Sequence, residues 1–164
     1  MKLTVSCVVA VLLSSSALAL AQPARPACAL MAAVDLKPLL NAGHAAPAPY
    51  ADTGCIVKSA TPDRLVLLMV VEKSNAELKR DMAADKKNLS SKEYAAISTV
   101  VAAPAFGPEA FSAREKGERS AAEIHAMKGT HAVVVVLNWS KGPITEPIFK
   151  QLNELTASVL GKLP

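Results

Sequence analysis

The order of apolar and polar positions along the chain predicts a mixture of strands and helices. Five segments have the composition of β-strands and are separated by turns rich in Gly, Pro and Asp. The strands are expected at residues 55–59, 64–72, 111–115, 121–127 and 131–138. We therefore expect an α+β fold, with an antiparallel sheet of about five strands and helices packed on it.

Apolar residues at helical spacing and capping patterns predict the helices. Leucines and valines recur at near-helical spacing in residues 30–40, where Pro38 would kink or shorten a helix and Gly43 would end it. Ser74 and Glu77 form a capping-box pattern ahead of a helix over residues 75–88. Ser90 and Glu93 repeat that pattern, which predicts a second short helix continuing through Tyr94, Ile97, Val100 and Val101.

The final helix has the clearest pattern. Thr145 can cap it, and one apolar stripe runs along it through Ile148, Leu152, Leu155 and Val159. A C-terminal amphipathic helix lying on the sheet is therefore predicted.

Two of the predicted strands are apolar on both faces. Residues 65–71 and 133–137 contain only Val, Leu and Met, whereas a half-exposed antiparallel strand alternates apolar and polar residues. Both strands should therefore be central and bury both faces. Either the chain's own helices and loops cover the second face, or that face is an apolar binding surface. The residues predicted for such a surface are Val66, Leu68, Val70, Val134 and Val136.

The first residues have the layout of an export signal. Lys2, an apolar run and an Ala19-Leu20-Ala21 ending are typical of a signal peptide over residues 1–21, so the mature protein is expected to be periplasmic or secreted. Residues 22–27 are expected to be a flexible lead-in, and residues 28–164 a single domain. Cys28 and Cys55 would then form a disulfide; a redox-active pair would instead favour C-x-x-C proximity.

Charge and hydropathy exclude two classes of partner. The net charge of +4 comes from interspersed acidic and basic residues, and the few aromatic residues are not interleaved with lysines, so nucleic-acid binding is not expected. After cleavage of the leader, the longest apolar runs fall far short of the roughly 20 residues of a spanning helix. No transmembrane anchor is expected in the mature chain.

Candidate chemical groups are few. Glu77, Asp81 and Asp85 would form one row on a helix, most simply as part of a solvated mixed-charge surface. His125 and His131 flank a predicted hairpin turn, and a two-residue loop would place them on opposite faces of the sheet. The sequence contains none of the common nucleophile, zinc-protease, P-loop or dinucleotide motifs, so no catalytic residue, metal ligand or cofactor is predicted.

Several landmarks resemble a diffuse group of small bacterial envelope proteins of unknown function, many of them lipoproteins. They are Cys28-Ala29-Leu30-Met31 opening a short helix that ends at Gly43, Cys55 opening a strand, residues 107–111, the strand at 133–137 and the closing helix. The chain departs from the group in lacking a lipobox before Cys28 and in having Pro108 where an acidic residue is common. The resemblance implies a compact α+β domain with an antiparallel sheet and a disulfide, and transfers no catalytic residues.

These features together predict an exported, non-enzymatic domain that binds a protein partner or an apolar ligand through an apolar sheet face. Two alternatives come from other classes of protein. One is a small exported hydrolase whose site is assembled from distant segments, which requires a histidine close to a serine or a carboxylate in a pocket. The other is a metal-binding envelope protein that uses His125, His131 and nearby Met127 or Glu123.

Overall fold

The structure is a computed structural model that describes residues 26–40, 43–61, 63–117, 120–139 and 142–164. The predicted signal peptide and residues 22–25 lie outside the described residues. Pro26 and Ala27, the last two residues of the stretch expected to be a flexible lead-in, belong to a helix, and Ala27 is fully buried. In the described part, no helix has the length and apolar character needed to cross a membrane.

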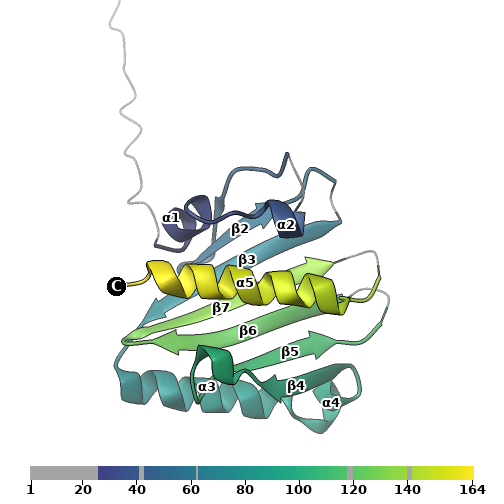
Figure 1. The fold of residues 1–164 in the computed structure, drawn as a ribbon. Helices are drawn as coiled ribbons and strands as arrows, with labels where there is room; N and C mark the ends of the chain where they lie inside the picture. The colour runs from purple at the N-terminus through teal and green to yellow at the C-terminus, as the bar shows by residue number, and fades with distance from the viewer. Residues whose placement is uncertain (1–25, 41–42, 62, 118–119, 140–141) are drawn as a thin grey trace, which may run out of the picture.

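The described residues form one antiparallel sheet of seven strands, two more than the sequence suggested (Figure 1). The spatial order is β1-β2-β3-β7-β6-β5-β4, so the two most apolar strands, β3 and β7, are neighbours at the centre. The strands are β1 (Ala48–Tyr50), β2 (Gly54–Lys58), β3 (Arg64–Glu72), β4 (Ser98–Ala102), β5 (Phe111–Glu115), β6 (Ser120–Lys128) and β7 (His131–Trp139).

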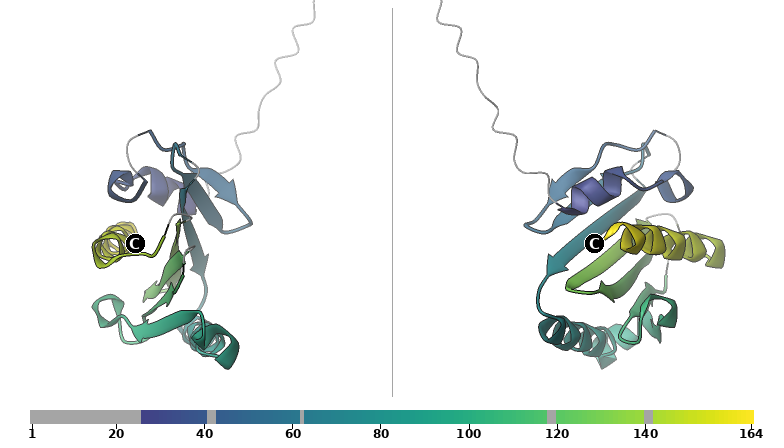
Figure 2. Two further views of the ribbon diagram at one scale, coloured as in Figure 1. Left: turned by 90° about the vertical axis from the view of Figure 1, so that its right-hand side faces the viewer. Right: turned by 60° about the vertical axis from the view of Figure 1, so that its left-hand side comes forward.

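The helices cover the two faces of the sheet unequally. Helices α1 (Pro26–Ala32), α2 (Lys37–Leu40) and α5 (Glu146–Lys162) lie on one face. Helix α3 (Asn75–Leu89) lies on the other face, next to the short α4 (Lys92–Ala95), as the edge-on view in Figure 2 shows. A 3-10 turn, η1 (Pro104–Phe106), follows β4.

The main core lies between the sheet and the α1–α2–α5 layer. Inward-facing residues of β3 and β7 pair directly, Val66 with Leu137 and Leu68 with Val135, and all four are fully buried. Leu152 and Val159 of α5 pack against the same cluster, as their predicted stripe requires. Thr145 occupies the N-cap position of α5, although its side chain makes no capping hydrogen bond.

Three local predictions were wrong. The single helix expected over residues 30–40 is two short helices, because Pro38 occupies the first turn of α2, where its missing N–H costs nothing. Residues 44–54, where no strand was expected, contain edge strand β1. The helix expected to continue through Val101 ends at Ala95, and β-branched residues 99–101 belong to edge strand β4 instead.

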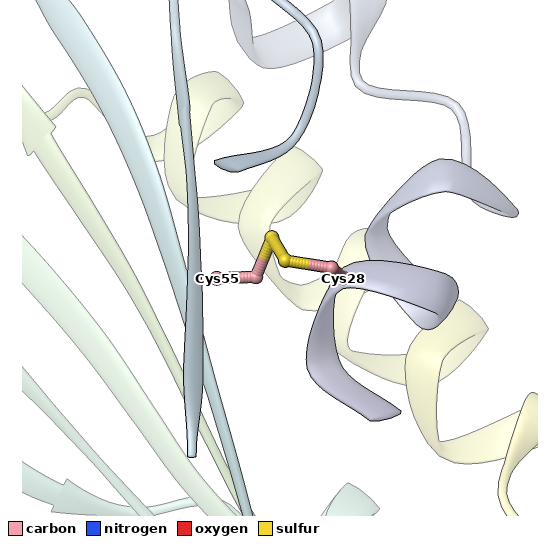
Figure 3. The surroundings of a disulfide bond; sticks show 2 residues. All are labelled: Cys28 and Cys55. Atoms are coloured by element: carbon pink, nitrogen blue, oxygen red, sulfur yellow. A yellow bond between two sulfur atoms is a disulfide. The ribbon is translucent and has the colours of Figure 1, made fainter. Parts of the chain in front are cut away.

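The predicted disulfide is confirmed. Cys28 of α1 and Cys55 of β2 are bonded, with Cα atoms 5.0 Å apart and a separation of 27 positions in sequence (Figure 3). Cys55 is fully buried. The bond ties the first helix of the described chain to the sheet.

Candidate functional site

The face of the sheet opposite α5 carries a continuous strip of apolar side chains. We call it the open strip; it consists of Ile56, Leu65, Leu67, Met69, Val134 and Val136. Leu67 is opposite Ile56 on one side and Val136 on the other, and Met69 is opposite Val134, so these side chains share one face. Each is only partly exposed, whereas Val66, Leu68 and Val135 on the other face are fully buried.

The apolar binding face predicted from the sequence differs from the open strip. Val66, Leu68 and Val70 lie on the α5 face, in the main core, whereas Val134 and Val136 lie on the opposite face. The predicted set therefore does not form one surface. A shift of one residue in strand register exchanges the faces, and the sequence alone does not fix the register between two strands separated by about 60 residues.

Helix α3 borders the open strip and covers the adjacent part of the face. The predicted capping box is confirmed: the Ser74 side chain accepts from the Glu77 N–H, and the Glu77 carboxylate accepts from the Ser74 N–H. Leu78 and Met82 are buried towards the sheet. Asp85 follows them at helical spacing, so the same helix face brings its carboxylate to the sheet.

His125 of β6 lies beneath Asp85. Its ring stacks on Phe111 of β5, with ring centroids 4.3 Å apart and planes inclined by 17°. Its Nδ1 is 3.8 Å from an Asp85 carboxylate oxygen, and its Nε2 is 3.5 Å from one of Glu123, two residues earlier on the same face of the strand. Both distances exceed ordinary hydrogen-bond lengths. The imidazole is thus held between two carboxylates without a hydrogen bond to either.

The burial of His125 makes this arrangement unusual. The residue is only 7% exposed, and within the described part of the chain neither ring nitrogen has a hydrogen-bond partner. Buried polar atoms in native proteins are nearly always paired, so an unpaired imidazole requires a functional or structural explanation.

Two cavities meet at His125. The larger, about 320 Å³, has apolar walls from Met69, Leu89, Tyr94 and Val134 and polar walls from Asp85, Asn88, Glu123 and His125. The smaller, about 140 Å³, lies under α3 beside Leu78 and Met82 and is also lined by Asp85 and His125. The larger cavity shares Met69 and Val134 with the open strip and therefore forms its end at α3.

A third cavity lies on the α5 face. It is about 400 Å³ and is lined mainly by β4, β5 and α5. Arg114 borders it, with its guanidinium 4.0 Å from the centre of the Phe149 ring and 2.6 Å from a Glu146 carboxylate oxygen. That hydrogen bond lowers the pKa of Glu146. Here the charges are paired within the chain, in contrast to the cavity beside His125.

The remaining candidate groups do not gather into a site. Strand pairing of Lys128 with His131 places His125 and His131 on opposite faces, as the hairpin geometry predicted, so the two cannot bind one metal ion together. His44 is partly exposed, precedes β1 in the chain and contacts the carbonyl oxygen of Ala45. Across the described ranges, no group of three or more His, Cys, Asp or Glu residues has the arrangement of a metal site.

The predicted acidic row on α3 exists, but its members have different roles. Glu77 caps the helix, Asp81 forms a 2.7 Å ion pair with Lys73, and Asp85 faces His125. Hydrogen bonding to Lys73 lowers the pKa of Asp81. The spacing of His125 and Glu123 already indicated a shared strand face, whereas the approach of Asp85 depends on how α3 packs and has no signal in the sequence.

Comparison with known proteins adds no relative: no protein-family model matches the chain, and no curated protein matches it. Function must therefore be argued from the site itself.

Proposed function

We propose that this protein is an exported, non-enzymatic binding domain that holds an apolar small molecule on the open strip. The observation that carries the proposal is the strip itself: six neighbouring apolar side chains on two central strands and β2, each partly exposed. Apolar surface left accessible in this continuous form is typical of binding sites.

A small molecule is favoured over a protein partner because the strip leads into a cavity. The cavity of about 320 Å³ beside α3 combines four apolar walls with a small number of polar groups. Its volume is at the low end of the range of about 300 to 1,000 Å³ that is typical of small-molecule sites. A ligand in the cavity could extend its apolar part along Met69 and Val134.

Export is supported by two independent features. Residues 1–21 have the composition of a signal peptide, and the Cys28–Cys55 bond is compatible with an oxidising compartment. A structural disulfide is also useful to a binding domain that functions outside the cell, because it limits unfolding where no chaperone system of the cytoplasm acts.

Titration with Nile red, a neutral apolar dye, tests the proposal. The dye should bind the mature protein with a blue shift in emission, and Val136→Thr, which places a hydroxyl on the open strip, should weaken binding several-fold. Val101→Thr is the matched control, because Val101 is 55% exposed on β4 and faces the opposite side. Absence of dye binding, or equal affinity of both variants, would contradict the proposal; a protein bound instead on the same face would replace the small molecule as the occupant.

A small exported hydrolase is a second candidate, favoured by one observation. His125 is close to two carboxylates at the edge of a cavity, as general acid-base chemistry requires. The binding role is preferred because the described residues that line this cavity include no serine or cysteine to act as a nucleophile. Hydrolysis of p-nitrophenyl butyrate that is abolished by His125→Ala would favour the hydrolase.

A further inference from the structure

We propose that the cavity beside α3 selects ligands that carry a positively charged organic ammonium group attached to an apolar body. The inference deepens the proposed function, on which it rests, by assigning the chemical class of the ligand. It comes from the charges around the cavity, from the enclosed imidazole and from the separation of polar and apolar walls.

The charges that face the cavity are negative. Asp85 and Glu123 line it from α3 and from β6, and their side chains are 51% and 24% exposed. Among the described residues, the ion pairs found for these two carboxylates are both with His125. In each pair the distance from nitrogen to oxygen is longer than a hydrogen bond. The nearest lysine on the adjoining cavity, Lys73, is already 2.7 Å from Asp81.

Several other carboxylates are paired with a lysine or arginine of the chain. Glu109 is 2.9 Å from Lys79, and Glu146 is 2.6 Å from Arg114. The cavity, by contrast, is lined by two carboxylates and by no described lysine or arginine. A cationic ligand would supply the missing charge, and charge-assisted hydrogen bonds to carboxylates are among the stronger ones.

His125 provides the second, independent observation. It borders the cavity and is only 7% exposed. In the described chain, neither ring nitrogen makes a hydrogen bond. A neutral imidazole keeps one acceptor nitrogen, which an ammonium donor could use after a small local movement. The stacking on Phe111 fixes the ring between the two carboxylates, so the polar end of the cavity is organised before a ligand arrives.

The walls define how such a ligand would lie. Met69, Leu89 and Val134 form the apolar side, and the open strip continues from Met69 and Val134 towards β2. Tyr94 lines the cavity and is 46% exposed, so its ring can contact an ammonium group through a cation–π interaction. The apolar body would lie over Met69 and Val134, and the ammonium group would be directed at Asp85 and Glu123.

The test compares three probes that carry a phenylalkyl body and differ in the charge of the head group: 4-phenylbutylamine, 4-phenylbutanol and 4-phenylbutyrate. Each is titrated into ¹⁵N-labelled mature protein and followed by NMR. The amine should bind about tenfold more tightly than the alcohol, as one charge-assisted interaction would give, and the butyrate should bind most weakly. The largest shifts should occur at residues 85–94 and at His125. High salt should reduce the advantage of the amine.

Glu123→Gln removes the charge and keeps the shape, so it should remove most of the advantage of the amine over the alcohol. Glu154→Gln is the matched control, because Glu154 is on α5, across the sheet. If all three probes bind equally, the charge selectivity is wrong and the proposed binding function stands. If the butyrate binds most tightly, the inference is overturned. If neither the probes nor Nile red binds, the proposed function fails as well.

Discussion

His125 stacks face to face on Phe111 with 4.3 Å between the ring centroids, although both of its nitrogens lack hydrogen bonds. The contact is made by the apolar faces of the ring, while the polar edge remains unpaired between Asp85 and Glu123. If the imidazole served stability alone, a phenyl ring would pack in the same place without leaving polar atoms unpaired.

Replacing His125 by Phe is therefore expected to leave the free energy of unfolding unchanged or to raise it by up to about 1 kcal/mol. His125→Ala should instead lower it by about 3 kcal/mol, because the ring that packs on Phe111 is lost and a cavity is left. Urea denaturation of both variants measures the difference. A strong destabilisation by His125→Phe would show that the imidazole nitrogens contribute to the fold.

Val135 and Val136 are adjacent in β7 and face opposite sides of the sheet. Val135→Thr should destabilise the protein by about 1 to 3 kcal/mol, because its hydroxyl would be buried in the main core without a partner. Val136→Thr should change stability by less than about 0.5 kcal/mol, because water reaches the open strip. Thermal and urea unfolding of the two variants provide the comparison. The reverse order of effects would mean that the register of β7 is shifted by one residue.

Gly54 is required by the close approach of β1. A Cβ at this position would lie 2.7 Å from the Tyr50 carbonyl oxygen, a backbone atom that cannot easily move. Gly54→Ala should therefore cost about 1 to 3 kcal/mol of stability.

Gly161 of α5 is the matched control, because a Cβ there meets no atom within 4 Å. Gly161→Ala should stabilise the protein by about 0.5 kcal/mol through its higher helix propensity. Equal effects of the two alanines in chemical denaturation would argue against the close approach of β1.

The disulfide should make a large contribution to stability. Closing a loop with 27 residues of separation is expected to contribute about 3 to 4 kcal/mol, mainly through the entropy of the unfolded chain. Denaturation with and without a reducing agent measures this contribution. A Cys28→Ala/Cys55→Ala double variant should match the reduced protein and show no response to the reductant. A midpoint that does not change on reduction would contradict the expected contribution.

The capping box of α3 should give the protein a specific pH dependence. Hydrogen bonds from Ser74 hold the pKa of Glu77 below its ordinary value of 4.5. Because the folded-state pKa is the lower one, the stabilisation is fully present above the ordinary value and is lost as the pH falls through the lowered folded value.

Glu77→Gln should consequently flatten the decline in melting temperature on acidification below about pH 5, while the amide still accepts the Ser74 N–H bond. Ser74→Ala, which removes the hydroxyl donor, should flatten the decline partly. Melting curves recorded at a series of pH values test both variants. Identical slopes for the wild-type protein and Glu77→Gln would contradict the role of this carboxylate.

Much of the secondary structure was predictable because it depends on local patterns. The bounds of β3 and β5 agree with the expected segments, and the Ser74–Glu77 pattern marks the start of α3 correctly. The two edge strands were missed for different reasons. Strand β1 is only three residues long and contains Pro49, whereas β4 follows a capping pattern that favoured a continued helix. In both cases pairing with a neighbouring strand outweighs the local preference.

The sequence by itself determined the α+β class, the central position of two apolar strands, the amphipathic α5 and the cysteine pair, because hydrophobic periodicity, capping and cysteine count are local properties of the chain. Only the tertiary structure decided which residues of β3 and β7 form the open strip, because register between distant strands is set by the whole sheet. The packing of α3 likewise decided that Asp85 would meet His125 and Glu123 at a cavity.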